Sequence, residues 1–149
     1  MGHKKILPPT YFWGSLLLMI GLHFLFPVMK VIVSPYNYSG IPLLIFGLVF
    51  NIWSSNYFNK VKTTVKPFEE SNYLVTEGLF KYSRHPMYFG MVLALAGLFI
   101  LLGSVTPSVV IPLFIWIITK KFILVEEKAL EDKFGEDYLK YKNKVRRWI

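Results

Sequence analysis

The stretch that decides the fold lies between residues 86 and 125 and reads PMYFGMVLALAGLFILLGSVTPSVVIPLFIWIITKKFILV. It is apolar except for two lysines near its end, and it is about twice as long as the roughly 20 residues that one membrane-spanning helix needs. A turn-forming stretch at 103–107, Gly-Ser-Val-Thr-Pro, interrupts it in the middle. We therefore predict a tight hairpin of two helices, at about 86–102 and 107–130, with the second helix spanning the membrane over about 107–125.

Two further apolar stretches upstream are long enough to span a bilayer, at about 11–33 and 40–58. A polar connector, 59–85, separates them from the hairpin, and a charged tail with helical character covers 126–149. The sequence predicts a single all-α domain over 1–149, a polytopic membrane protein with about four transmembrane helices and a cytoplasmic C-terminal helix. The first stretch lacks a small-residue cleavage site, so we expect a retained helix rather than a signal peptide.

The composition supports a membrane protein and excludes several other classes. Hydrophobic residues make up 54% of the chain, charged residues only 17%, and the mean hydropathy is +0.44. These values disfavour a disordered chain, a coiled coil and an ordinary soluble enzyme. The absence of cysteine excludes disulfides, thiolate catalysis and Cys-based zinc sites, and with only three histidines we predict no metal site.

The distribution of basic residues predicts the orientation of the chain. The net charge is +8, and of the 17 Lys and Arg residues only Lys30 lies outside the N-terminus, the connector and the end of the chain after residue 119. By the positive-inside rule these segments are cytoplasmic, so both termini face the cytoplasm and the basic groups meet anionic lipid rather than nucleic acid. A chain this small and free of cysteine is typical of a prokaryotic cell membrane.

One unusual group of residues marks the entry of the connector into the third span. Arg84, His85 and Tyr88 place a cation, an imidazole and a phenol around Pro86, which suits the first turn of a helix. The free N–H groups of a helix start, beside Arg84 and His85, favour an anionic group such as a carboxylate. The alternative is an interfacial belt of aromatic and basic side chains.

A second unusual group follows the fourth span, where Glu126 and Glu127 are adjacent. Two carboxylates at a membrane boundary are costly unless they are paired or used, so they could pair with Arg84 or with a cationic ligand. The alternative is a solvated start to the tail. Further on, aromatic and apolar residues recur every three or four positions between Phe134 and Trp148, which predicts an amphipathic helix against the membrane domain.

Polar residues inside the spans give weaker indications. Asn51 in the second span could line a substrate cavity or make interhelical hydrogen bonds. Gly90 and Gly97 in the third span fall at helical spacing and predict close approach of a neighbouring helix. The chain contains no Gly-x-Gly, His-Glu-x-x-His or Gly-x-Ser-x-Gly, so nucleotide folds, zinc proteases and serine hydrolases of the usual kinds are excluded.

Four short motifs together resemble the isoprenylcysteine carboxyl methyltransferase and phospholipid methyltransferase superfamily over about residues 58–149. They are Leu74-Val75-Thr76-x-Gly78, Arg84-His85-Pro86-x-Tyr88-x-Gly90, Glu126-Glu127-x-x-Leu130 and Phe134-Gly135-x-x-Tyr138-x-x-Tyr141. The resemblance implies an integral membrane methyltransferase that uses S-adenosyl-L-methionine and a lipidic or hydrophobic small-molecule acceptor.

The resemblance also implies site residues. The cofactor-binding set would be Asn72, Tyr73, Leu74, Val75, Phe80, His85, Pro86, Met87, Tyr88 and Glu126. Arg84 and Glu127 would be catalytic, and we add Lys121 and Asn51 as candidates for substrate binding. The prenylcysteine enzymes carry an arginine where this sequence has Phe122, beside Lys121, and this departure leaves the acceptor open.

Three other functions stay open. The first is N-methylation of a phospholipid headgroup, in which Glu127 or His85 would take a proton from the ammonium. The second is an NADPH-dependent membrane reductase of the sterol reductase type, whose known members are much longer. The third is a non-catalytic membrane scaffold. The sequence does not indicate an oligomeric state.

Overall fold

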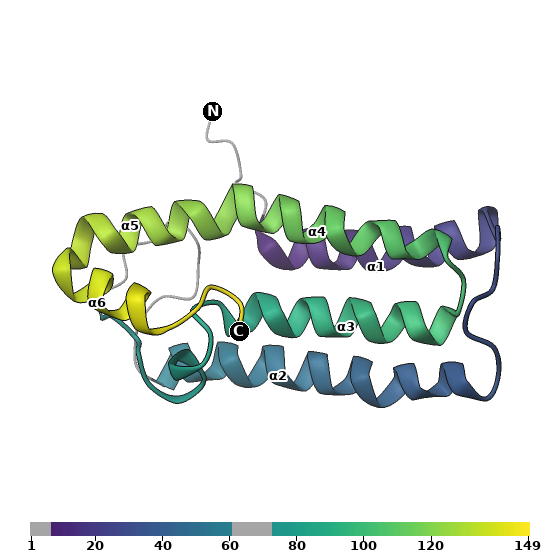
Figure 1. Cartoon of the computed structure of the whole chain (residues 1–149), viewed down its shortest axis with the longest axis horizontal. Coiled ribbons are helices and arrows are strands. Elements are labelled where there is room, and N and C mark those ends of the chain that lie inside the picture. Colours follow the sequence, from purple (N-terminus) through teal and green to yellow (C-terminus); the bar gives the residue numbers. More distant parts are fainter. Residues whose placement is uncertain (1–6, 61–72) are drawn as a thin grey trace.

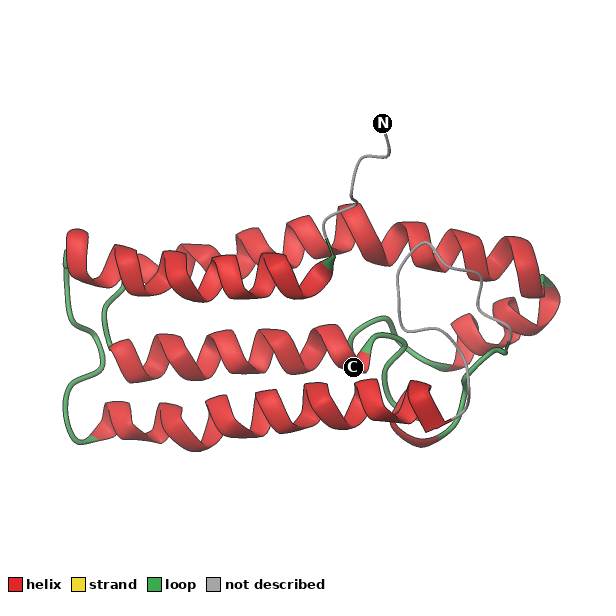
Figure 2. Ribbon diagram, turned by 180° about the vertical axis from the view of Figure 1, so that it is seen from behind, coloured by secondary structure: helices red, strands yellow, loops and turns green. Residues whose placement is uncertain are grey.

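The computed structural model describes residues 7–60 and 73–149, and within them the protein is helical with no named β-strand (Figures 1 and 2). The α-helices are α1 (Pro8–Leu25), α2 (Gly40–Lys60), α3 (Pro86–Leu102), α4 (Val110–Ile118), α5 (Leu124–Phe134) and α6 (Glu136–Lys144). A π-helical turn, Thr119–Ile123, joins α4 to α5 without a break.

Helices α1 to α4 lie along the long axis of the molecule, each antiparallel to the one before it, with α3 at the centre (Figure 1). α2 packs on one side of α3, whereas α1 and α4 pack on its other side. The bends between α1 and α2 and between α3 and α4 lie at one end. The other end, which we call the polar end, contains the start of α3, the helices α5 and α6, and residues 145–149.

Glycines allow α2 and α3 to pack with their backbones almost touching. A Cβ atom added at Gly97 would lie 2.3 Å from the backbone nitrogen of Leu44, and one added at Gly47 would lie 2.4 Å from that of Ala94. Small residues at such spacing are typical of helix pairs in membranes, where close van der Waals packing replaces the hydrophobic effect. The expected packing face on the third span is confirmed.

The ends of α3 follow from local signals. Pro86 occupies the first turn, where its missing N–H costs nothing, and Gly103 ends the helix in the left-handed conformation at φ 73°. The carbonyl of Gly103 accepts hydrogen bonds from the N–H groups of Val31 and Ile32, so the turn after α3 is tied to the segment after α1. The predicted helix bounds 86–102 are therefore confirmed, and its crossing of a membrane stays a prediction.

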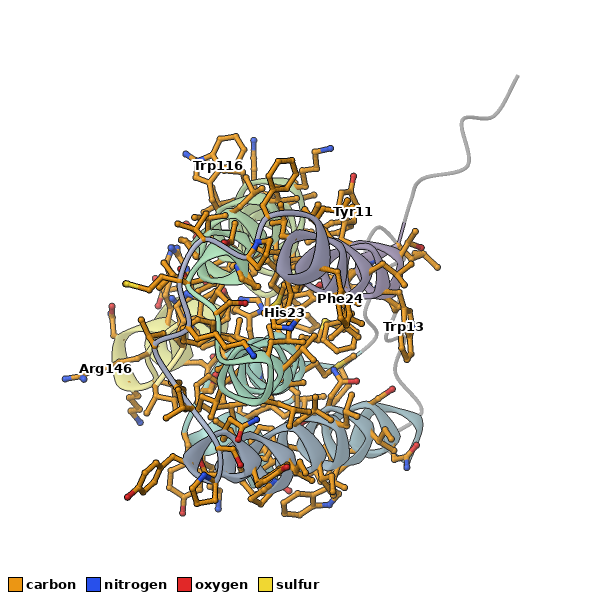
Figure 3. The ribbon with its side chains drawn as sticks, turned by 90° about the vertical axis from the view of Figure 1, so that its right-hand side faces the viewer. Tyr11, Trp13, His23, Phe24, Trp116 and Arg146 are labelled. Carbon is orange, nitrogen blue, oxygen red and sulfur yellow. The ribbon has the colours of Figure 1, made fainter. Side chains whose placement is uncertain are left out.

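Within residues 7–60 and 73–149, two helical stretches are long and apolar enough to cross a membrane, Tyr36–Tyr57 and Thr106–Phe134, and a shorter apolar helix covers Pro86–Leu102. Large apolar side chains on the outside of the bundle face away from the protein, as Trp13 and Trp116 do at 60% and 61% exposure (Figure 3). Soluble proteins rarely expose so many such residues, which indicates an apolar surrounding. His23 instead lies inside, where its Nδ1 is 2.5 Å from Ser104 Oγ.

Three predicted boundaries are wrong. The first helix ends at Leu25 rather than near residue 33, because Pro27 disfavours helical geometry at the residue before it. The last long helix continues beyond its predicted end near residue 130 and reaches Phe134. The amphipathic helix expected between Phe134 and Trp148 covers only α6, because Gly135, at φ 50°, separates it from α5 and residues 145–149 are not helical.

Candidate active site

The candidate active site lies at the polar end, where the connector enters α3. Ser83 Oγ accepts a hydrogen bond from the N–H of His85 at 3.2 Å, and His85 is the non-helical residue immediately before Pro86. Proline keeps the residue before it out of the α-helical region. Sequence and local hydrogen bonding therefore hold the His85 ring over the first turn of α3.

His85 lies between the two adjacent carboxylates that begin α5. Its Nδ1 is 3.5 Å from Glu126 Oε2, and its Nε2 is 3.3 Å from Glu127 Oε1. Burial by itself lowers the pKa of His85, but the hydrogen bonds and negative charges of Glu126 and Glu127 outweigh it and raise the pKa above 6.5. The arrangement therefore favours a protonated imidazolium held by two carboxylates.

Glu127 is buried and has three cationic neighbours. Arg147 donates to both of its oxygens, from Nε to Oε1 at 3.0 Å and from Nη2 to Oε2 at 2.7 Å. Arg84 Nη2 is 3.1 Å from Oε1, the oxygen that also faces His85. Because every direction around the carboxylate is occupied, Glu127 acts here as an anchor for cations and has little capacity to accept a further proton.

Glu126 is the more open of the two carboxylates. Tyr88 Oη, from the first turn of α3, donates to Glu126 Oε1 at 2.5 Å. The Tyr88 ring stacks on the His85 ring with 5.8 Å between centroids. The Glu126 side chain nevertheless remains 23% exposed, against 5% for Glu127, so Glu126 is the carboxylate that can reach a ligand.

A small apolar cluster supports the site from the polar end. It consists of Val75, Phe80, Tyr138 and Tyr141, and the hydroxyl of Tyr141 donates to the carbonyl of Phe80 at 2.7 Å. Beside it, a cleft of about 260 Å³ is lined by Tyr57, Tyr73, Val75 and Glu77. Two aromatic rings and one carboxylate in a cleft of this size suit a planar, hydrogen-bonding ligand.

Arg84 has donors that no described residue uses. Its side chain is only 8% exposed, yet Nε and Nη1 have no hydrogen-bond partner among the residues that the structure describes. The hydroxyl of Tyr138 is also buried without such a partner. Buried donors are normally satisfied, so the N–H groups of Arg84 that lack a described partner are candidates for binding an anionic group.

Most of the site residues predicted from sequence come together. Arg84, His85, Pro86, Tyr88, Glu126 and Glu127 gather around the start of α3, and the predicted pairing of Arg84 with a glutamate is confirmed. Leu74, Val75 and Phe80 join the apolar cluster, and Tyr73 lines the cleft. Asn72 lies outside the described residues.

The two residues predicted to bind substrate make other contacts. Asn51 donates through Nδ2 to the carbonyl of Met87 at 2.9 Å, which is the interhelical alternative. Lys121, on the π-helical turn, donates to the hydroxyl of Tyr11 at 2.9 Å and so faces α1. Neither side chain has a contact with Glu126 in the structure, and a role in substrate binding stays a prediction.

Sequence reasoning missed two features of the site. Arg147 was not predicted to be a site residue, because no local pattern in the sequence indicates that a residue 20 positions after Glu127 bonds to its carboxylate. The π-helical turn before α5 was also missed, although such turns occur often at functional sites. Among the described residues no group of His, Asp or Glu side chains is arranged to hold a metal ion.

Comparison with known proteins gives a family and several curated relatives. The family model described as phospholipid methyltransferase matches residues 36–137. Proteins named protein-S-isoprenylcysteine O-methyltransferase are similar: one from Schizosaccharomyces pombe is 36% identical over 72 residues, covering 48% of this chain and 30% of the relative. The Saccharomyces cerevisiae protein is 35% identical over 88 residues, covering 59% and 36%.

A relative of the same name from Rattus norvegicus is 32% identical over 111 residues, covering 72% of this chain and 38% of the relative. The chain thus spans about a third of the length of these curated relatives. The family match includes both the His85–Tyr88 segment and the adjacent glutamates. From this match over more than half of its length, the chain belongs to the phospholipid methyltransferase family.

Proposed function

We propose that this protein is a membrane-embedded methyltransferase that uses S-adenosyl-L-methionine and acts on a lipidic or hydrophobic acceptor, in the manner of an isoprenylcysteine carboxyl methyltransferase. The family match supports methyl transfer as the reaction, and the relatives named for isoprenylcysteine O-methylation support a lipidic or hydrophobic acceptor. The single observation that carries the site is the contact of Tyr88 with Glu126, which joins two segments 38 residues apart at the end of an apolar bundle.

The chemical groups of S-adenosyl-L-methionine fit the side chains at the polar end. The unpaired, buried N–H groups of Arg84 suit its carboxylate, and the partly open Glu126 suits its ammonium or ribose hydroxyls. The aromatic rings of Tyr57 and Tyr73 suit its adenine. These residues would hold the cofactor, which supplies an electrophilic methyl group on a positively charged sulfur.

The residues of the chain contribute alignment and exclusion of water rather than acid–base chemistry. Glu127 contacts Arg84, Arg147 and His85, the two carboxylates around His85 raise its pKa, and Glu126 accepts a hydrogen bond from Tyr88. Because each of these groups already has a partner, we infer no free general base among the described residues of the site, which favours an acceptor that is already nucleophilic, such as a carboxylate or thiolate. Holding it near the methyl group in a dry site reduces the barrier by orientation alone.

Methylation of a phospholipid amine is the second candidate. The description of the matching family favours it, and the partly open carboxylate of Glu126 could bind a cationic headgroup. This reaction needs loss of a proton from the ammonium before transfer, so Glu126 would first have to release Tyr88. Its requirement for a base distinguishes it from carboxylate methylation.

We also propose four transmembrane helices, in the regions of 8–25, 40–58, 86–102 and 107–125, with both termini and the polar end in the cytoplasm. The antiparallel course of α1 to α4 supports this arrangement (Figure 1), as does the gathering of basic residues in the segments at the polar end. The cofactor would then enter from the cytoplasm and the acceptor from the bilayer. A prokaryotic cell membrane is the proposed location.

Calorimetry on the purified protein in lipid nanodiscs tests the cofactor assignment. We expect S-adenosyl-L-methionine to bind and NADPH not to bind. Glu126→Gln and His85→Gln should each weaken binding strongly, whereas Glu131→Gln, which removes an acid of the same helix that pairs with Lys142, should leave it unchanged. Binding of NADPH alone would favour a reductase, and binding of neither ligand would favour a scaffold.

A further inference from the structure

Residues 145–149 connect three parts of the site that are far apart in sequence. The N–H of Arg84 donates to the carbonyl of Arg146 at 3.0 Å, and Ser83 Oγ donates to the carbonyl of Arg147 at 3.3 Å. Two residues of this segment therefore lie beside the two residues that precede His85.

The same segment crosses from one apolar core to the other. Val145 packs against the cluster of Phe80, Tyr138 and Tyr141 at the polar end, and Trp148 packs against the core of the helix bundle. The segment is not helical, with Val145 in an extended conformation. We call residues 145–149 the strap, because they cover the junction between the bundle and the polar end.

Arg147 extends from the strap into the charged cluster. Its guanidinium grips both oxygens of Glu127 in a two-pronged contact, at 3.0 and 2.7 Å, which fixes the direction of the carboxylate. Glu127 in turn holds Arg84 at 3.1 Å and His85 at 3.3 Å. The position of the two groups on the connector side therefore depends on a contact made by the strap.

We infer that the strap completes the site and that Arg147 is a positioning residue, which orients Glu127 and through it Arg84 and His85. This inference rests on the proposed function, because it takes these groups to hold S-adenosyl-L-methionine. The Arg147 side chain remains 35% exposed, and among the described residues its hydrogen bonds go to Glu127, so it does not need to touch the ligand.

The chain offers a close control in Arg146, the preceding residue of the strap. Its side chain is exposed and points away from the bundle (Figure 3), and only its carbonyl takes part in the site. Arg146→Ala therefore removes the same charge from the same segment without touching Glu127. Arg147→Lys keeps the charge but loses the two-pronged grip.

The first measurement is the affinity for S-adenosyl-L-methionine in nanodiscs. Arg147→Ala should weaken binding by about tenfold or more, since two charge-assisted hydrogen bonds that orient the cluster are lost. Arg147→Lys should lie between this variant and the wild type, and Arg146→Ala should stay within about twofold of wild type. Equal losses in Arg146→Ala and Arg147→Ala would refute the inference, because charge alone would then explain them.

The second measurement uses the protein without ligand and follows the pKa of His85 by NMR of labelled histidine rings. The charged and titratable groups around His85 are Glu126 and Glu127 from α5, Tyr88 from α3, the neighbouring Arg84, and Arg147 from the strap. Removing the cation at 147 leaves Glu127 less neutralised, so the pKa of His85 should rise in Arg147→Ala and stay unchanged in Arg146→Ala.

The two measurements separate failure of the inference from failure of the proposed function. If the wild type binds no S-adenosyl-L-methionine, the proposed function fails, and the His85 titration alone decides whether the strap orders the cluster. If the wild type binds and Arg147→Ala binds equally well, the positioning role is wrong. If Arg147→Ala does not fold, the affinity of Arg147→Lys decides the positioning role, because this variant keeps the charge and loses only the two-pronged contact.

Discussion

Replacing Glu127 by alanine should destabilise the fold far more than replacing its neighbour Glu126. The Glu127 carboxylate is 5% exposed and holds three cations, Arg84, His85 and Arg147. Without it, His85 can release its proton, and Arg147, which is 35% exposed, can turn towards water. Arg84 can do neither, because a guanidinium stays charged and its side chain is 8% exposed.

The cost is therefore that of one buried cation left without a carboxylate. Removing one partner of a buried ion pair typically costs about 3–5 kcal/mol. Two of the three nitrogens of Arg84 already lack partners among the described residues, so little compensation is at hand. We expect a loss of about 3 kcal/mol in the free energy of unfolding, which for a chain of this size lowers Tm by roughly 10 °C.

Thermal unfolding in nanodiscs, followed by circular dichroism, measures this loss. The matched control is Glu126→Ala, which removes the same side chain one position earlier, where it is 23% exposed and bonded to Tyr88 and His85 rather than to a guanidinium. Glu126→Ala should lower the free energy of unfolding by about 1 kcal/mol. Arg84→Leu placed in the Glu127→Ala background should recover stability, because it removes the stranded charge. Equal losses for the two glutamates would refute the reasoning.

Three further predictions concern packing, pH and orientation. Gly97→Ala should lower the free energy of unfolding by about 1–3 kcal/mol, because the added Cβ would lie 2.3 Å from the backbone of α2. Gly21→Ala, where the added Cβ meets open space, should leave it unchanged. Unfolding of both variants in detergent measures the difference. Because the folded-state pKa of His85 is raised, the stability that its charge contributes is complete below pH 6.5 and should be lost as the pH rises through the raised value, with a flat profile in His85→Gln. In this cysteine-free chain, Ser39→Cys and Asn143→Cys should react with a membrane-impermeant thiol reagent from opposite sides of the membrane; labelling from one side would contradict the four-span arrangement.

Local signals explain which parts of the fold could be predicted. The bounds of α3 are correct to the residue because Pro86 and Gly103 act on the backbone at their own positions. Pro27 is such a signal for the end of α1. The prediction instead followed the hydrophobic stretch that continues past Pro27, and it therefore placed the end of the helix too late. The last long helix was predicted to run past the apolar stretch to about residue 130, but its end at Phe134 was not located, because charged residues end an apolar stretch without ending a helix.

The candidate site divides in the same way. His85, Tyr88, Glu126 and Glu127 could be named because unusual residue types at a membrane boundary need a reason to be there. Their partners could not all be named, because a hydrogen bond between Arg147 and Glu127 depends on how residues 145–149 return across the start of α3. A contact of this kind follows from packing of the whole chain and leaves no periodic pattern in the sequence.

The most direct test of the central claim is transfer of a labelled methyl group. Wild type and Glu126→Gln, each purified in nanodiscs, would be incubated with S-adenosyl-L-methionine labelled on its methyl group and with a lipid extract or a prenylated cysteine derivative. We predict a labelled hydrophobic product with the wild type and its loss in Glu126→Gln. The absence of product with the wild type, or equal product with both proteins, would contradict a methyl-transfer site between the start of α3 and Glu126.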